Sequence, residues 1–213
     1  MNELEHQLHY PFGDTLPAPG ATQVVAPGEG SGLTPAVKWI RMALPFALDH
    51  INLWLLRDEI DGRQGWSVVD CCISVEPAKA QWQQIFASEL EGLPVLRVIV
   101  THMHPDHIGL AWWLCEKWQA PLWISASDYN MATIGSQIAN SFGGESAASF
   151  FALHGLNEPV TVAQVRGRAS YFTTLVPAIP RQFHRMLDGD ALRIGGRSWS
   201  CISGYGHAPE HIS

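Results

Sequence analysis

The segment from Thr101 to Gly109 concentrates side chains that can bind a metal ion. Within six positions it carries three histidines and one aspartate, namely His102, His104, Asp106 and His107. Neutral imidazole nitrogens and a carboxylate suit zinc, iron or manganese, and a short loop can direct several of them at one centre. The alternative is a polar helix start with Asp106 as its cap and the histidines on the surface. Three histidines beside an aspartate favour metal binding.

The residues on both sides of this loop predict how it is held. Val95–Val100 has the length and β-branched content of a buried strand. After the loop, Leu110, Trp113, Leu114 and Trp118 recur at helical spacing. The histidines therefore lie in a turn between a strand and a helix, which a buried sheet would hold rigidly.

The pattern His-x-His-x-Asp-His between such a strand and helix resembles the signature of the metallo-β-lactamase superfamily. A second stretch, Gly204–His211, resembles the Pro-Gly-His-Thr-Pro-Gly-His stretch of that family, whose first histidine is a metal ligand. This correspondence places a ligand at His207, although Tyr205 and Glu210 depart from the family pattern. His211 matches the second histidine, which is not a ligand and is interpreted as a structural residue.

The resemblance implies a metal centre with an open position. His102, His104 and His207 would hold one ion, while Asp106 and His107 would serve a second. Three imidazoles with an open position are typical of a catalytic site, because four protein ligands close a structural one. The implied cofactor is zinc, as one or two ions, with iron or manganese as further candidates. Asp106 is also the expected catalytic residue, which orients water or passes a proton to the leaving group.

Asp70 is the expected support of the metal loop. It ends the strand expected at residues 66–70 and resembles the aspartate of the family's Val-Asp-Thr-Gly, which holds the loop from behind. This chain reads Asp-Cys-Cys there, so Cys72 replaces the usual glycine. The alternative is an aspartate that only forms a turn at a strand end.

The resemblance implies a metal-dependent hydrolase that uses metal-activated water on a thioester, an ester or a lactone. No Gly-x-Ser-x-Gly elbow of a serine hydrolase is present in the sequence. One alternative is a persulfide dioxygenase-like enzyme with a single iron, since histidines with a carboxylate also suit iron. Another is a non-catalytic metal-binding module of the same fold.

Strands that alternate with helices predict an α/β layered fold, which the resemblance narrows to the metallo-β-lactamase-like αββα sandwich. Residues 37–42 alternate apolar and polar as a half-buried strand, and Arg57 to Gly65 are expected to form a polar hairpin turn. Further strands are expected at residues 51–56, 66–70, 95–100, 121–125, 183–186, 191–194 and 199–203. A helix is expected at residues 77–91.

Residues 127–180 are expected to form a helical insertion within a single domain that spans residues 1–213. Helical segments at 147–156 and 160–174 are separated by Asn157-Glu158-Pro159. The aromatic residues of the insertion are expected to pack as core more than to line a pocket, and its two arginines to face solvent. They are Phe150, Phe151, Tyr171, Phe172, Arg166 and Arg168.

Composition narrows the partners and the compartment. The net charge of −7 argues against a broad nucleic-acid footprint, which would be basic. The four cysteines form no CxxC pair, and the sequence shows neither a signal peptide nor a membrane-spanning stretch. We expect a cytoplasmic protein that acts on a small molecule without binding nucleic acid or membrane, with a homodimer as one candidate assembly.

The two ends of the sequence carry separate expectations. Residues 1–35 are interpreted as a surface arm with a short strand at Gln23–Val25. The family continues beyond the stretch that matches His207 with an aspartate that bridges two metals and a last histidine. This sequence stops at Ser213, so we expect the C-terminal part of the fold to be missing, with an exposed sheet edge and weak or absent hydrolytic activity. Asp188 and Asp190 are expected to be turn residues.

Overall fold

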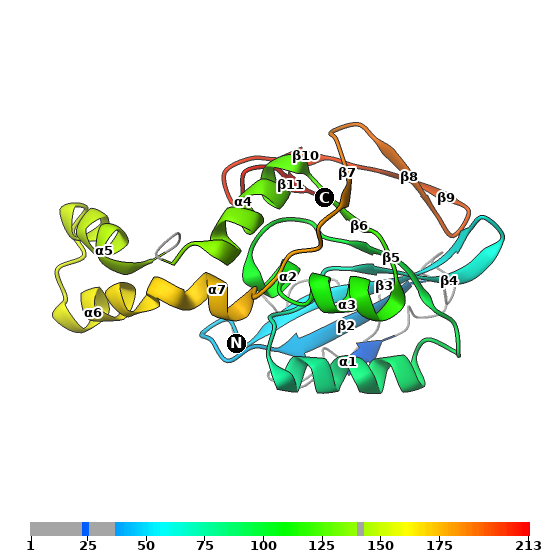
Figure 1. Ribbon diagram of the computed structural model, residues 1–213, viewed down its shortest axis with the longest axis horizontal. Helices are drawn as coiled ribbons and strands as arrows, with labels where there is room; N and C mark the ends of the chain where they lie inside the picture. Colours follow the sequence, from blue (N-terminus) through cyan, green and yellow to red (C-terminus); the bar gives the residue numbers. More distant parts are fainter. Residues whose placement is uncertain (1–22, 26–36, 140–142) are drawn as a thin grey trace, which may run out of the picture.

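A computed structural model describes residues 23–25, 37–139 and 143–213 of the chain (Figure 1). The expected surface arm lies outside the described residues, except for the strand β1 at Gln23–Val25. None of the helices in the described part of the chain has the length and apolar character needed to span a bilayer.

A seven-stranded sheet in the order β1-β2-β3-β4-β5-β6-β7 forms the centre of the molecule. Strands β1 to β4 pair antiparallel, whereas β4 to β7 pair parallel. Parallel strands need crossover connections, and α1 (Glu76–Ser88) supplies the first of them. The strands are β2 (Val37–Ala43), β3 (His50–Ile60), β4 (Arg63–Val69), β5 (Val95–Ile99), β6 (Leu122–Ile124) and β7 (Phe183–Arg185).

The sheet carries different layers on its two faces. Helices α1 and α3 (Ala111–Trp118) cover one face, where Trp82 is fully buried and donates to Cys71 O over 2.9 Å (Figure 1). The hairpin of β8 (Ala191–Ile194) and β9 (Arg197–Ser200) lies against the other, where Ile194 and Ile99 share a smaller apolar cluster. The predicted α/β class is therefore confirmed.

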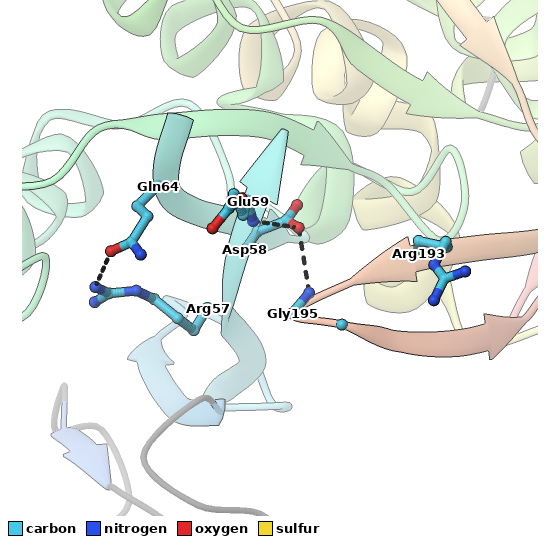
Figure 2. A pocket seen from close by; sticks show the side chains of 7 residues that line it. Arg57, Asp58, Glu59, Gln64, Arg193 and Gly195 are labelled. Carbon is cyan, nitrogen blue, oxygen red and sulfur yellow. Dashed lines mark hydrogen bonds between the residues drawn. The ribbon is translucent and has the colours of Figure 1, made fainter. Parts of the chain in front are cut away.

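The polar turn expected from Arg57 to Gly65 is wrong. Strands β3 and β4 continue through it, and Asp61 and Gly62 alone make the turn, both with positive φ. Such a two-residue turn suits the twist of a hairpin. One polar residue of β3, Asp58, is buried. The strand can hold it there because its carboxylate accepts hydrogen bonds from Arg97 and, over 3.3 Å, from Gly195 N (Figure 2).

Strand β2 is buried along both faces, whereas its alternating pattern predicted a half-buried strand. Its two basic residues, Lys38 and Arg41, are 8% and 4% exposed. Lys38 Nζ donates to the carbonyl of Glu89 at 2.7 Å and lies 5.0 Å from the Trp66 ring. Long basic side chains can cover apolar surface in this way while their charged ends find partners at the edge.

Helices occupy most of the region between β6 and β7, and the described residues there include no strand. Their bounds are α4 (Ala126–Gln137), α5 (Gly144–Leu153), α6 (Pro159–Gly167), the 3-10 helix η2 (Arg168–Ser170) and α7 (Tyr171–Leu175). Helices α5 and α6 pair and project away from the sheet, whereas α4 and α7 lie beside it (Figure 1). The insertion bounds of 127 and 180 stay a prediction.

The projecting helices correct the core expectation for two aromatic residues. Phe150 and Phe151 are 57% and 46% exposed, because α5 packs mainly against α6 and away from the sheet. Phe172 is buried as expected. Arg166 pairs with Glu145 on the exposed surface of this helix pair.

The last residues form short strands rather than the single strand expected at 199–203. Strand β9 ends at Ser200, and β10 (Ser203–Gly204) pairs with β11 (His211–Ile212). The loop between β10 and β11 contains His207. Asp188 and Asp190 lie in the turn before β8. Their carboxylates accept hydrogen bonds from Ser203 N and Leu187 N, respectively, both at 2.9 Å.

Candidate metal centre

The loop after β5 packs tightly on the turn after β4. Cys71 N donates to His107 O over 2.7 Å, and Leu110 N donates to Cys72 O over 3.0 Å. Cys72 has a φ of 70°, so it keeps a left-handed backbone that favours glycine although it carries a side chain. A Cβ at Gly109 would lie 2.7 Å from Cys72 O, so this close approach requires glycine. The histidine loop is therefore fixed from below.

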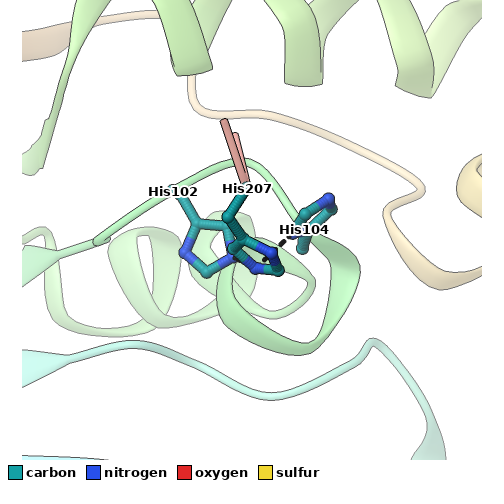
Figure 3. A group of neighbouring side chains, drawn as sticks. All are labelled: His102, His104 and His207. Atoms are coloured by element: carbon teal, nitrogen blue, oxygen red, sulfur yellow. Dashed lines mark hydrogen bonds between the residues drawn. The ribbon is translucent and has the colours of Figure 1, made fainter. Parts of the chain in front are cut away.

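Three imidazoles converge from two loops that are about a hundred residues apart (Figure 3). The Nε2 atom of His207 lies 3.1 Å from His102 Nε2 and 3.1 Å from His104 Nδ1. All three donor atoms lie within 4.8 Å of one another. Nitrogens bound at about 2.0–2.1 Å to a tetrahedral zinc ion lie roughly 3.3 Å apart, so the arrangement fits a metal ion. Among the described residues, this is the only such group.

The exposure of the three rings rises from one side of the cluster to the other. His102 is buried, His104 is half-buried and His207 is exposed. A metal ion held by these rings would therefore face solvent on the side of His207. An open side of this kind leaves room for water or a substrate.

Burial keeps the rings at the closed side neutral. It lowers the pKa of His102 to about 2, with further lowering by His107 and His104. Burial also lowers the pKa of His104, again with help from a neighbouring ring, His207. Neutral imidazoles are the form that binds a metal ion, so both rings are ready to act as ligands at neutral pH.

A hydrogen-bond network behind the cluster selects the tautomer of His102. Thr101 N and Oγ1 donate to the Asp70 carboxylate at 2.8 and 2.9 Å. Since the hydroxyl hydrogen goes to Asp70, Thr101 Oγ1 accepts from His102 Nδ1, which lies 3.0 Å away. The lone pair of His102 is therefore on Nε2, the atom that faces His207. A partner of this kind orients a metal-binding histidine. Asp70 thus contacts the loop as the sequence suggested.

Asp106 and His107 lie beside the three-histidine group and not within it. His107 Nδ1 donates to Asp70 Oδ2 over 2.7 Å, and its Nε2 lies 3.5 Å from Asp106 Oδ2. Burial lowers the pKa of His107, but the charge of Asp70 and its hydrogen bond outweigh this and raise it. The assignment of both residues to a second ion stays a prediction.

Two further residues of the last loop lie near the group. The ring of His211 is centred 4.6 Å from that of His102 and 6.1 Å from that of His207. Glu210 points to the start of α4, where its Oε2 accepts from Ser127 Oγ at 2.9 Å. Neither is in the group of converging donors.

Sequence reasoning missed Asp128, a fully buried aspartate in the first turn of α4. Its carboxylate accepts from Met103 N, which lies between two of the converging histidines, and from Glu210 N. Ser125 caps α4 and donates to the same carboxylate over 3.0 Å. The spacing Ser-x-x-Asp is a capping-box signal, which could have placed Asp128 at a helix start but not against the histidine loop.

Comparisons with known proteins cover the part of the chain that contains the three converging histidines. The model of the family described as the metallo-beta-lactamase superfamily matches residues 47–213. No curated protein matches the chain. A beta-lactamase domain protein from Burkholderia ambifaria has a similar structure, with 51% sequence identity and a TM-score of 0.81. The match covers 99% of this chain but 57% of that one.

More distant structures share the fold. A metallo-beta-lactamase family protein from Thermus thermophilus is 25% identical with a TM-score of 0.62, over 84% of this chain and 55% of that one. A metallo-beta-lactamase from Cronobacter sakazakii is 16% identical with a TM-score of 0.58, over 89% of this chain and 56% of that one. The chain thus spans between half and three-fifths of the length of these proteins.

Proposed function

The chain belongs to the metallo-beta-lactamase superfamily, and we propose that it is a metal-dependent hydrolase that cleaves a thioester, an ester or a lactone. One observation carries the proposal. Two loops, distant in sequence, bring three imidazole nitrogens within 4.8 Å of one another at a site that is buried on one side and open on the other. The family resemblance and the sandwich fold expected from the sequence are both confirmed by the comparisons.

His102, His104 and His207 would hold the ion, with zinc as the first candidate and iron or manganese as others. When bound, such an ion lowers the pKa of a coordinated water from 15.7 to about 7 and polarises a carbonyl oxygen. With three protein ligands, the ion would keep an open position for water or substrate. Since His207 is the exposed member, a substrate would approach from its side.

Asp106 is our candidate for proton transfer. Its side chain is 23% exposed, so it can reach a substrate in the open side while it stays anchored in α2 (Pro105–Ile108). A carboxylate there can orient the attacking water, accept its proton and pass that proton to the leaving group. Tyr171 begins α7, which contacts α2, and burial together with the negative charge of Asp106 raises the pKa of its hydroxyl.

The negative charge around the histidines also supports a bound cation. Asp70 and Asp128 are 4% and 0% exposed, and Asp106 is half-buried beside them. The hydrogen bonds to Asp128 come from backbone amides and a hydroxyl, none of which carries a formal charge. A divalent ion would supply the missing positive charge, and such ions are often the largest local charges in a site.

Elemental analysis of the purified chain, followed by a panel of thioesters, esters and lactones, tests this proposal. We expect bound metal in stoichiometric amount and weak turnover of one acyl class, both absent in a variant with His102→Ala and His104→Ala. Oxygen consumption without hydrolysis, with iron bound, would favour the dioxygenase instead. Bound metal without either activity would favour a non-catalytic module. A chain that neither contains metal nor takes it up from added Zn2+ would contradict the metal centre itself.

A further inference from the structure

Asp128 is buried at a point where three segments of the chain meet. It lies in the first turn of α4, whose N-cap is Ser125, and its side chain has no exposed surface. A buried carboxylate loses its hydration, and it is retained only where hydrogen bonds replace the lost water. The partners of Asp128 therefore show what the residue does.

Each carboxylate oxygen of Asp128 holds a different ligand loop. Oδ1 accepts from Met103 N at 2.9 Å, and Met103 separates His102 from His104. Oδ2 accepts from Glu210 N at 2.8 Å, three residues after His207. One rigid group thus bridges the backbones of the two loops that supply the imidazoles.

We propose that Asp128 is a positioning residue of the metal centre, whose carboxylate sets the separation between the His102–His104 loop and the His207 loop. The inference rests on the proposed metal site and adds a residue that touches neither the ion nor the substrate. The two loops are also linked by Ile212 N, which donates to Thr101 O over 2.9 Å. Loss of Asp128 should therefore loosen the His207 side of the centre without releasing it.

The chemistry of the partners explains why a carboxylate is required. Both loops offer backbone N–H donors, and Ser125 Oγ donates as well, so every partner needs an acceptor. An asparagine has a single acceptor oxygen, and its amide group would face one of the N–H donors. Asp128→Asn therefore retains the size of the side chain but can hold only one of the two loops.

A Co2+ titration of the full chain, followed by visible absorption, tests the role. We expect Asp128→Asn to bind Co2+ about 10–100-fold more weakly, as for other residues that orient metal ligands, and to alter the absorption bands of the bound ion. The matched control is Asp58→Asn, which changes another buried aspartate with hydrogen-bonded neighbours. It should lose stability in urea but retain the Co2+ affinity and spectrum of the unsubstituted chain.

The outcomes separate this inference from the proposed function. Equal affinity and spectrum in Asp128→Asn and the unsubstituted chain would overturn the role of Asp128 and leave the metal centre intact. Failure of the unsubstituted chain to bind Co2+ or Zn2+ would overturn both. If Asp128→Asn does not fold, Asp128→Glu replaces it, because it keeps two acceptor oxygens but displaces them by one methylene from Met103 N and Glu210 N. Weaker Co2+ binding by Asp128→Glu would support the role, and unchanged binding would overturn it.

Discussion

Asp58 and Asp128 are both buried, and their charges are compensated in different ways. Asp58 is 2% exposed and accepts two hydrogen bonds from the guanidinium of Arg97, at 2.9 and 2.6 Å, and one from Ser67. Asp128 is fully buried and accepts from two backbone amides and one hydroxyl. The register places Asp58 opposite Gly65, near the start of β4, whereas the histidine loop packs on the turn after that strand's end.

We infer from this difference that Asp58 serves the stability of the fold, whereas Asp128 serves the metal site. Arg97 neutralises Asp58 and also donates to Arg193 O at 2.7 Å, so this ion pair fastens the β8–β9 hairpin to the sheet. Asp128 directs its hydrogen bonds to loops and leaves its charge beside the histidines, where it acts to raise the pKa of His104 against the lowering by burial. A bound cation would complete the charge balance at the histidines, whereas the ion pair is complete by itself.

The largest expected effect is the loss of metal from the three-histidine site. Changing both His102 and His104 to Ala removes two of three ligands and should abolish stoichiometric metal, as measured by elemental analysis. His154→Ala is the control, since His154 is an exposed histidine on the projecting helices. A double variant that still copurified with one ion per chain would show that the ligand assignment is wrong.

At Asp58 we expect a large loss of stability with the metal retained. Arg97→Met leaves the Asp58 carboxylate buried without a cation, which should cost about 3–5 kcal/mol in the free energy of unfolding measured in urea. Arg193→Met, a change to an exposed side chain in the adjacent hairpin, should stay within about 0.5 kcal/mol. Loss of Co2+ binding in a folded Arg97→Met protein would argue against the independence of the two regions.

Acid should lower the free energy of unfolding of the metal-free chain, because His102 is buried as a neutral ring. The pKa of His102 is about 2 in the folded chain, against about 6.5 in an unfolded one. Between these values the unfolded chain binds more protons, so the free energy of unfolding falls as the pH falls. The raised pKa of His107 acts above about pH 6.5, since that contribution is fully present below it and is lost as the pH rises.

The test is urea unfolding of the chelator-treated protein between about pH 6.5 and 4.5. His102→Asn should flatten the decrease in stability with falling pH, because the ionisable ring is gone. Arg193→Met should retain the original slope, since the side chain is exposed and a guanidinium does not titrate in this range. An unchanged slope in His102→Asn would count against the buried neutral ring.

The smallest effect is expected where neither network reaches. Leu153 is 85% exposed on α5, so Leu153→Ser should change the free energy of unfolding by no more than about 0.5 kcal/mol and leave Co2+ affinity unchanged.

We also predict that limited proteolysis cuts first within residues 127–180, where helices α5 and α6 contact mainly each other. First cuts in the sheet strands would contradict this.

Short-range patterns in the sequence were enough to predict several local elements and the chemistry of the histidine loop. Strand β5 and helix α1 were predicted close to their bounds, because a run of β-branched residues and a helical apolar face are short-range signals. The spacing of His102, His104, Asp106 and His107 in one turn likewise predicted the type of site. Asp58 shows the limit, since a buried polar strand residue is stable only beside Arg97, which is 39 positions away.

Which metal-binding side chains converge depends on the folded chain. His107 lies in the same loop as His102, yet its Nδ1 bonds to Asp70, while the exposed His207 comes from the other end of the chain to within 3.1 Å of His102. Asp128 was likewise found only in the folded chain, because nothing in its spacing relates it to Met103 or Glu210. The orientation of each ring depends on hydrogen bonds to partners from other strands and helices, and only the packing of those elements brings such partners together.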